Sequence, residues 1–246
     1  MRRIMAIINV SLKSIFQFKS LIMVYLGIVL ICTAVIGIAG AKLLIEPASG
    51  RIDESTLVYY IGILGYCAAV ILTGVNYCVL FSVPLTREKV NKNIESLLAT
   101  ISSVKELWVA KSIALFLPGF LLGTIIPLFL TFIFSSIYLS SSFVVFSNVW
   151  TVLCTYFAVQ VIYLCLSLLI HFVGLVGNTE AGNVIATIFL PVFAGLVINL
   201  LARQILDINS SVFFISNICL AVILFSVCMI FRYKLRKEKI ILSCQK

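Results

Sequence analysis

Six long apolar runs, without a single Asp, Glu, Lys or Arg, constrain this chain more than any other feature. They cover residues 21–41, 57–83, 113–139, 149–173, 184–201 and 212–231. About 20 helical residues cross the ~30 Å hydrocarbon core of a bilayer, and a helix satisfies its own backbone groups there. The composition agrees, because 62% of the 246 residues are hydrophobic and only 11% are charged. The sequence therefore predicts an all-α integral membrane protein, with residues 1–246 forming one transmembrane domain of six helices.

The distribution of Lys and Arg predicts the orientation. Of the 18 basic residues, four precede the first run, five lie in the 84–112 loop and six lie in the tail 232–246. The other three, Lys42, Arg51 and Arg203, fall on the opposite side. The positive-inside rule then places both termini and the 84–112 loop in the cytoplasm. We read the net charge of +9 as an orientation signal and as contacts with anionic lipids, not as a nucleic-acid surface.

Residues 1–20 carry a helical pattern of their own. Their apolar side chains lie opposite Arg3, Lys13 and other polar groups, at Ile4, Ile7, Ile8, Leu12, Ile15 and Phe16. This pattern is typical of an amphipathic helix that lies in the membrane interface. The first apolar run is longer than the ~7–15 residues usual in a signal peptide, so we expect an uncleaved first span.

The apolar runs offer few groups for chemistry. Ion-coupled carriers usually bury charged residues as relays, and here all such residues lie outside the runs. A single histidine cannot form an H-E-x-x-H metal site, and no Gly directly precedes a Lys, as a P-loop requires. The eight cysteines contain no C-x-x-C pair and fit apolar packing better than metal binding. We therefore expect no catalytic residue, no metal site and no bound cofactor in this chain.

Three polar side chains within the runs could line a pathway, namely Asn76, His171 and Asn199. His171 could act as a pH-sensitive gate, since histidine can change its charge near physiological pH. The alternative, which we favour, is a histidine near the interface that donates a hydrogen bond to a carbonyl. For Asn76 and Asn199, hydrogen bonds between helices are the favoured alternative to a polar route.

The 84–112 loop predicts two helical pieces at the cytosolic surface. The first has an apolar stripe at helical spacing, through Val90, Ile94, Leu97, Leu98 and Ile101. Glu88 and Lys92 are spaced to form an ion pair, and Pro84 is expected to end the preceding span. The second piece begins with Ser103-Val-Lys-Glu, which has the form of a capping box, and continues into the third run. Such a loop could transmit force to that run or merely rest on lipid.

The loop also contains a recognisable residue order. Arg87-Glu88-Lys89 is followed by Ile94-Glu95-Ser96-Leu97-Leu98-Ala99-Thr100, and then by Ser103, Glu106 and Lys111. This segment resembles the inner-loop signature of ABC-2 type transporter permeases, in which R-E-x-G-T-x-E-x-L-L-A-T-P-x-S follows span two. Ile101 stands where that family often has proline, and Asn91 or Lys92 stands where glycine is common. The basic interfacial helix, the six spans and the basic tail fit the same family.

The resemblance implies a permease subunit in a cell membrane (inner or plasma membrane). It would pair with a second permease subunit, identical or not, on two separate ATPase subunits. The loop would then be a cytosolic coupling helix between spans two and three. Its contacts with the ATPase would involve Arg87, Glu88, Glu95, Leu97 and Leu98. ATP and magnesium would bind the ATPase, and its closure would tilt the coupling helix and move the third span.

Glycine and proline interrupt the third and fifth runs, at Pro118, Gly119, Gly123, Pro127 and Pro191. Gly119-Phe-Leu-Leu-Gly123 is a G-x-x-x-G pattern, which permits close approach of two helices, and prolines permit bends. Ordinary packing and a hinge role are both open at these positions.

Taken with the resemblance, the sequence predicts the permease subunit of an ABC-2 type exporter that a separate ATPase powers. An apolar path between paired subunits would suit hydrophobic or amphiphilic cargo. One alternative is a membrane scaffold or sensor that recruits a cytosolic partner through the same loop. Another is an ion-coupled secondary carrier, which the uncharged runs disfavour.

Overall fold

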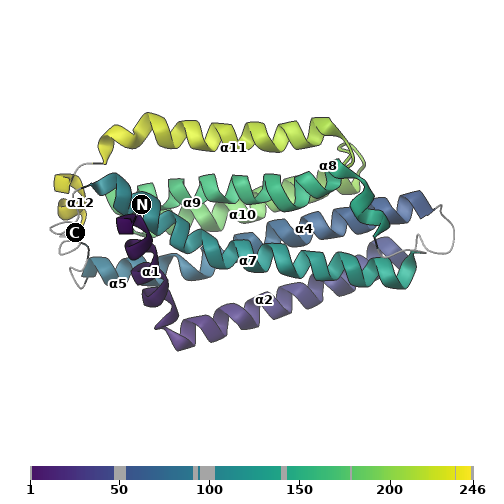
Figure 1. The fold of residues 1–246 in the computed structure, drawn as a ribbon, viewed down its shortest axis with the longest axis horizontal. Coiled ribbons are helices and arrows are strands. Elements are labelled where there is room, and N and C mark those ends of the chain that lie inside the picture. The colour runs from purple at the N-terminus through teal and green to yellow at the C-terminus, as the bar shows by residue number, and fades with distance from the viewer. Residues whose placement is uncertain are drawn as a thin grey trace.

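A computed structural model describes residues 2–46, 54–90, 94, 103–139, 143–177, 179–235 and 237–244. The regular structure of these residues is helical and contains no strand. Figure 1 shows long helices that run side by side as a bundle, with shorter helices at one end. The predicted all-α class is therefore confirmed.

Six helical segments among the described residues are long and apolar enough to cross a membrane, which agrees with the predicted number of spans. They are Lys19–Ile45, Glu54–Thr86, Val104–Tyr138, Val149–Val176, Glu180–Leu201 and Ser211–Lys234. The main helices in them are α2 (Lys19–Gly40), α4 (Glu54–Leu80), α7 (Val104–Tyr138), α9 (Val159–Val176), α10 (Thr179–Ala202) and α11 (Ser211–Phe231). These six helices indicate a multi-pass membrane protein.

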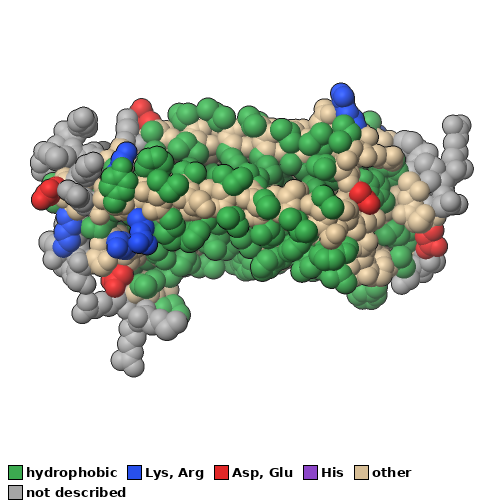
Figure 2. Space-filling model, turned by 90° about the horizontal axis from the view of Figure 1, so that it is seen from above, with side chains coloured by type: hydrophobic (Ala, Val, Ile, Leu, Met, Phe, Trp, Pro, Cys, Tyr) green, Lys and Arg blue, Asp and Glu red, His purple; other side chains and the backbone are tan. Residues whose placement is uncertain are grey.

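Three shorter helices, α1 (Arg2–Phe16), α5 (Ser82–Val90) and α12 (Lys237–Cys244), gather at one end of the bundle, which we call the basic end (Figure 1). On the face in Figure 2, hydrophobic side chains cover the middle of the bundle and charged side chains lie near its two ends. The first and last described helices, α1 and α12, thus lie at the same end of the bundle, as the predicted topology requires. Which side faces the cytoplasm stays a prediction.

The first helix, α1, runs across the bundle axis and packs against α7 (Figure 1). Its predicted apolar face is divided, because Ile15 is buried in the core whereas the neighbouring Phe16 is exposed. Met5 and Val10 are exposed as well. The helix therefore presents apolar side chains both to the bundle and away from it.

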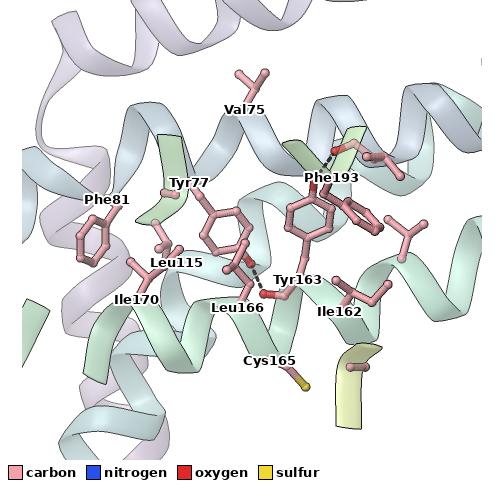
Figure 3. Packing of buried hydrophobic residues seen from close by; sticks show 14 of the residues in the cluster. Val75, Tyr77, Phe81, Leu115, Ile162, Tyr163, Cys165, Leu166, Ile170 and Phe193 are labelled. Carbon is pink, nitrogen blue, oxygen red and sulfur yellow. Dashed lines mark hydrogen bonds between the residues drawn. The ribbon is translucent and has the colours of Figure 1, made fainter. Parts of the chain in front are cut away.

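The second span, α4, forms the centre of the bundle and packs against α2, α7, α9 and α10. Small residues let its neighbours approach, and a side chain at Gly74, for example, would lie 2.7 Å from the hydroxyl of Tyr163 on α9. Tyr77 and Tyr163 stack with their ring centroids 5.6 Å apart, and each hydroxyl donates to a carbonyl of the other helix (Figure 3). These bonds satisfy phenol groups that would otherwise be buried without partners.

The helix of the second span is interrupted before its predicted end at residue 83. The apolar segment runs to Thr86, but α4 ends at Leu80 and a bend at Phe81 separates it from α5. The reason is that Pro84, which has no N–H, cannot bond the carbonyl four residues earlier, and its ring crowds that carbonyl. The second loop helix and the third span form one helix from Val104, as the sequence predicts, so that helix starts before the apolar run at residue 113.

Short irregular segments complete the fold. They are two π-helical segments, η1 (Ala41–Ile45) and η3 (Leu153–Ala158), two 3₁₀ segments, η2 (Val144–Ser147) and η4 (Arg232–Lys234), and α8 (Val149–Val152). The fourth span starts at the predicted residue, Val149. Its start is capped by Asn148, whose side-chain oxygen accepts a hydrogen bond of 2.9 Å from the Trp150 N–H.

Candidate functional site

A buried ion pair joins the loop helix to the third span at the basic end. Lys111 of α7 donates to the carboxylate of Glu88 on α5. The two side chains are 5% and 13% exposed, so both charges are largely removed from solvent. A buried pair of this kind fixes the position of one helix relative to the other, since separating the charges would leave each without compensation.

The next residue of α5 binds the fourth span. The ammonium group of Lys89 donates a hydrogen bond of 2.7 Å to the carbonyl of Gly177, the residue that follows α9. The last carbonyls of a helix lack intrahelical partners and carry partial negative charge, so a cation is favourable there. Two consecutive residues of α5 therefore attach it to α7 and to α9.

A small cavity of about 20 Å³ lies beside the ion pair. Its lining comes from α1, α4, α5, α7 and α9 and includes Ser11, Leu80, Glu88, Lys111 and His171. Such a volume can hold about one water molecule if polar partners are present, and these side chains supply them. The cavity marks the point where these five helices meet at the basic end.

His171 packs inside this junction. Its side chain is buried, and its ring meets that of Phe81 edge-on, with the centroids 5.2 Å apart. The ring Nδ1 lies 3.2 Å from the carbonyl of Ser167, one turn earlier in α9, so an N–H at that position donates to it. This geometry favours the interpretation in which His171 donates to a carbonyl.

The third span approaches the second closely at its two G-x-x-x-G glycines. A side chain at Gly119 would lie 2.9 Å from Asn76, and one at Gly123 would overlap Thr73. Both glycines are buried at the contact of α7 with α4. The close approach needs glycine because any larger residue would force the two helices apart.

Pro127 frees a carbonyl within this contact. An N–H at position 127 would bond the carbonyl of Gly123, but proline has none. The Gln160 side chain of α9 lies 3.4 Å from the Gly123 oxygen and can donate to it. Gln160 is buried at mid-span, and its second polar atom, Oε1, has no hydrogen-bond partner in the structure. A neighbouring helix thus partly compensates for the proline.

Asn76 of α4 binds the backbone of the third span near its other proline. Its amide donates a hydrogen bond of 2.7 Å to the carbonyl of Leu115, three residues before Pro118. It is fully buried, so it links α4 to α7. Asn199 lies apart from it, exposed near the end of α10, and Pro191 is exposed in the middle of the same helix. The structure does not bring Asn76 and Asn199 together as one polar route.

Several predicted docking residues lie outside the described residues, namely Glu95, Leu97 and Leu98. Arg87 belongs to α5, but its side chain is not described. Of the predicted apolar stripe, Ile94 is fully buried in this chain's own core. That portion of the stripe therefore packs inward. Lys92, which the spacing pairs with Glu88, also lies outside the described residues, and the described partner of Glu88 is Lys111.

Sequence reasoning missed three residues that connect the helices. Lys89 and Lys111 enter the sequence analysis only as basic loop residues within the inner-loop signature, and Gln160 is not singled out there. Gln160 carried a signal, because an amide in the middle of an apolar run must find a partner within the bundle. The pairing of Lys111 had no such signal, since it depends on how α5 folds back on α7.

No family model, curated protein or solved structure matches this chain.

Proposed function

We propose that this chain is the permease subunit of an ABC-2 type exporter, which works with a separate ATPase subunit. The observation that supports this most is the double attachment of α5, through Glu88 to α7 and through Lys89 to α9. These residues belong to the segment that resembles the family's inner-loop signature. A helix attached to two spans can pass a displacement to both of them.

The third span is suited to receive that displacement. α7 continues for 35 residues, which corresponds to about 50 Å of helix. One end carries Lys111 at the basic end, and the middle carries the close contact with α4. A tilt of the ATPase-bound loop would therefore change the packing of α7 against α4 at membrane depth.

The transport path in this proposal runs between two paired permease subunits in a cell membrane. The exposed surface of the spans is rich in large apolar side chains, including Met23, Leu30, Val192 and Ile223. Such surfaces suit a hydrophobic or amphiphilic cargo that enters from the lipid phase. ATP and magnesium bind the partner ATPase in this proposal.

The test is to purify the chain gently from its native membranes and identify the proteins that accompany it. We expect a stoichiometric soluble partner with a P-loop. Leu97→Asp should release this partner while membrane insertion is retained, because a charge in an apolar docking contact is left without compensation. Ile205→Asp is a matched control, since Ile205 is exposed at the opposite end of the bundle.

Two results would contradict the proposal at different points. If Leu97→Asp retained the partner at wild-type stoichiometry, the loop would not be the docking site. A purified complex without any nucleotide-binding partner would contradict the transporter itself. The chain would then be better explained as a scaffold or sensor in the membrane.

A further inference from the structure

A cavity of about 340 Å³ opens between α10 and α11, in the half of the bundle away from the basic end. Side chains from both helices and their connection line it, among them Phe189, Phe193, Val197, Leu206, Phe213 and Leu220. It arises because α11 packs on α9 and η3, whereas α10 packs on α9 and α4. The two consecutive helices therefore diverge and leave space between them.

The polar groups at the cavity already have partners. The Tyr66 hydroxyl donates a hydrogen bond of 2.7 Å to Asn217 Oδ1, and Asn217 Nδ2 donates to the Phe213 carbonyl at 2.8 Å. The Ser216 hydroxyl also donates to the Phe213 carbonyl, at 2.7 Å. The remaining lining is apolar, so the wall favours an apolar occupant.

The mouth of the cavity indicates the source of that occupant. Val192 and Leu196 line the cavity and are 60% and 57% exposed, in a helix long and apolar enough to cross a membrane. At this depth the surrounding medium is the hydrocarbon of lipid chains. A single extended hydrocarbon chain is narrow and apolar along its whole length, so it suits this apolar space that opens toward lipid.

The connection that contributes Leu206 to the cavity also carries a cation. Arg203 is exposed in the connection between α10 and α11, three residues before Leu206. It directly follows the membrane-crossing helix α10, at the depth where lipid headgroups are expected, and a guanidinium group can bind a phosphate with two hydrogen bonds. We propose that this cavity binds one acyl chain of a phospholipid, with the phosphate group of that lipid at Arg203. This inference stands apart from the transport proposal.

The first experiment counts bound lipid. The full-length chain is inserted into nanodiscs of phosphatidylglycerol and released into the gas phase for native mass spectrometry. We expect the wild type to retain one phospholipid per chain. Ser216→Trp, which places an indole at the cavity, should reduce retention about tenfold, equivalent to about 1.4 kcal/mol. Ile215→Trp is the matched control, because Ile215 is exposed on the same helix but does not line the cavity.

The phosphate contact has its own test. With equal amounts of phosphatidylglycerol and a diacylglycerol of the same chains, Arg203→Gln should lower the preference for the phospholipid by up to about fivefold, as for an exposed ion pair. An unchanged preference would overturn the role of Arg203.

Photochemistry on the wild-type chain gives a test that needs no variant. A phosphatidylglycerol with a diazirine in its acyl chain should label Phe193, Val197 and Phe213, which are at most 9% exposed and which surrounding lipids do not reach. Adducts restricted to exposed residues such as Ile223 would overturn the proposal. So would equal retention by the Ser216→Trp and Ile215→Trp variants, or a cavity filled by side chains of a second copy without lipid.

Discussion

Lys111 is a buried cation whose described charge partner is the Glu88 carboxylate. We expect Glu88→Gln to destabilise the protein by about 3–5 kcal/mol, because it leaves the ammonium group buried without a compensating charge. Lys111→Met should cost a similar amount by isolating Glu88. The measurement is the loss of monodisperse protein on heating in mild detergent, followed by size-exclusion chromatography.

The double variant with Glu88→Gln and Lys111→Met supplies the control. It replaces both charges with neutral groups, so it should be closer to the wild type in stability than either single variant. Additive losses in the double variant would show that the two residues act separately and would contradict the pairing.

This ion pair also shows that the partner of a charged residue could not be predicted from sequence spacing. Spacing along one helix suggested Lys92 as the partner of Glu88, and that argument considers only neighbours within a helix. Lys111 is 23 positions away, and it meets Glu88 because the chain reverses between α5 and α7. A contact of this kind depends on tertiary structure and could not be predicted from local pattern.

Among the helices, the contact of α4 with α7 depends on glycine. A methyl group at Gly123 would overlap Thr73, so Gly123→Ala should destabilise the fold by about 1–3 kcal/mol. Gly195→Ala provides the comparison, since no atom lies within 4 Å of the added group at that position of α10. That change should be neutral or stabilising by up to about 1 kcal/mol, because alanine favours helix. Both variants can be compared by thermal unfolding in the same detergent.

A second substitution, at Thr73 on α4, tests whether the overlap with Thr73 causes the cost of Gly123→Ala. If overlap with Thr73 is the cause, adding Thr73→Gly should make Gly123→Ala less costly than it is alone. An equal cost in both backgrounds would place the strain elsewhere. The G-x-x-x-G pattern was visible in the sequence, but its partner was not, because Thr73 and Asn76 belong to a span that nothing in the pattern identifies.

Helix ends were predicted where the signal is local. Ser103 stands at the N-cap position of α7 with an extended backbone, as the capping box indicated, although its side chain makes no capping hydrogen bond. Pro84 was recognised as a helix breaker, but its effect falls three residues earlier, at Phe81. The reason is physical, since proline disrupts the hydrogen bond to the carbonyl four residues before it.

For the whole molecule, hydropathy predicted the number of spans but not their arrangement. α4 is the most enclosed span, yet its segment has the lowest mean hydropathy of the six, at 1.9. Its central place follows from small residues such as Gly65 and Gly74, which bring other helices close. Apolar content reports how well a helix suits lipid, whereas enclosure depends on packing shape.

The orientation of the bundle is the prediction on which the proposed ATPase contact depends. Cys244 ends α12 at the basic end, and Arg203 lies exposed at the other. A membrane-impermeant maleimide should label an Arg203→Cys variant in intact cells, but reach Cys244 only after permeabilisation, because the excess of Lys and Arg favours the cytoplasm. Cys244→Ser provides the background from the cysteines within the spans. Labelling of Cys244 in intact cells, with position 203 protected, would invert the bundle and place α5 beyond the reach of any ATP-dependent partner.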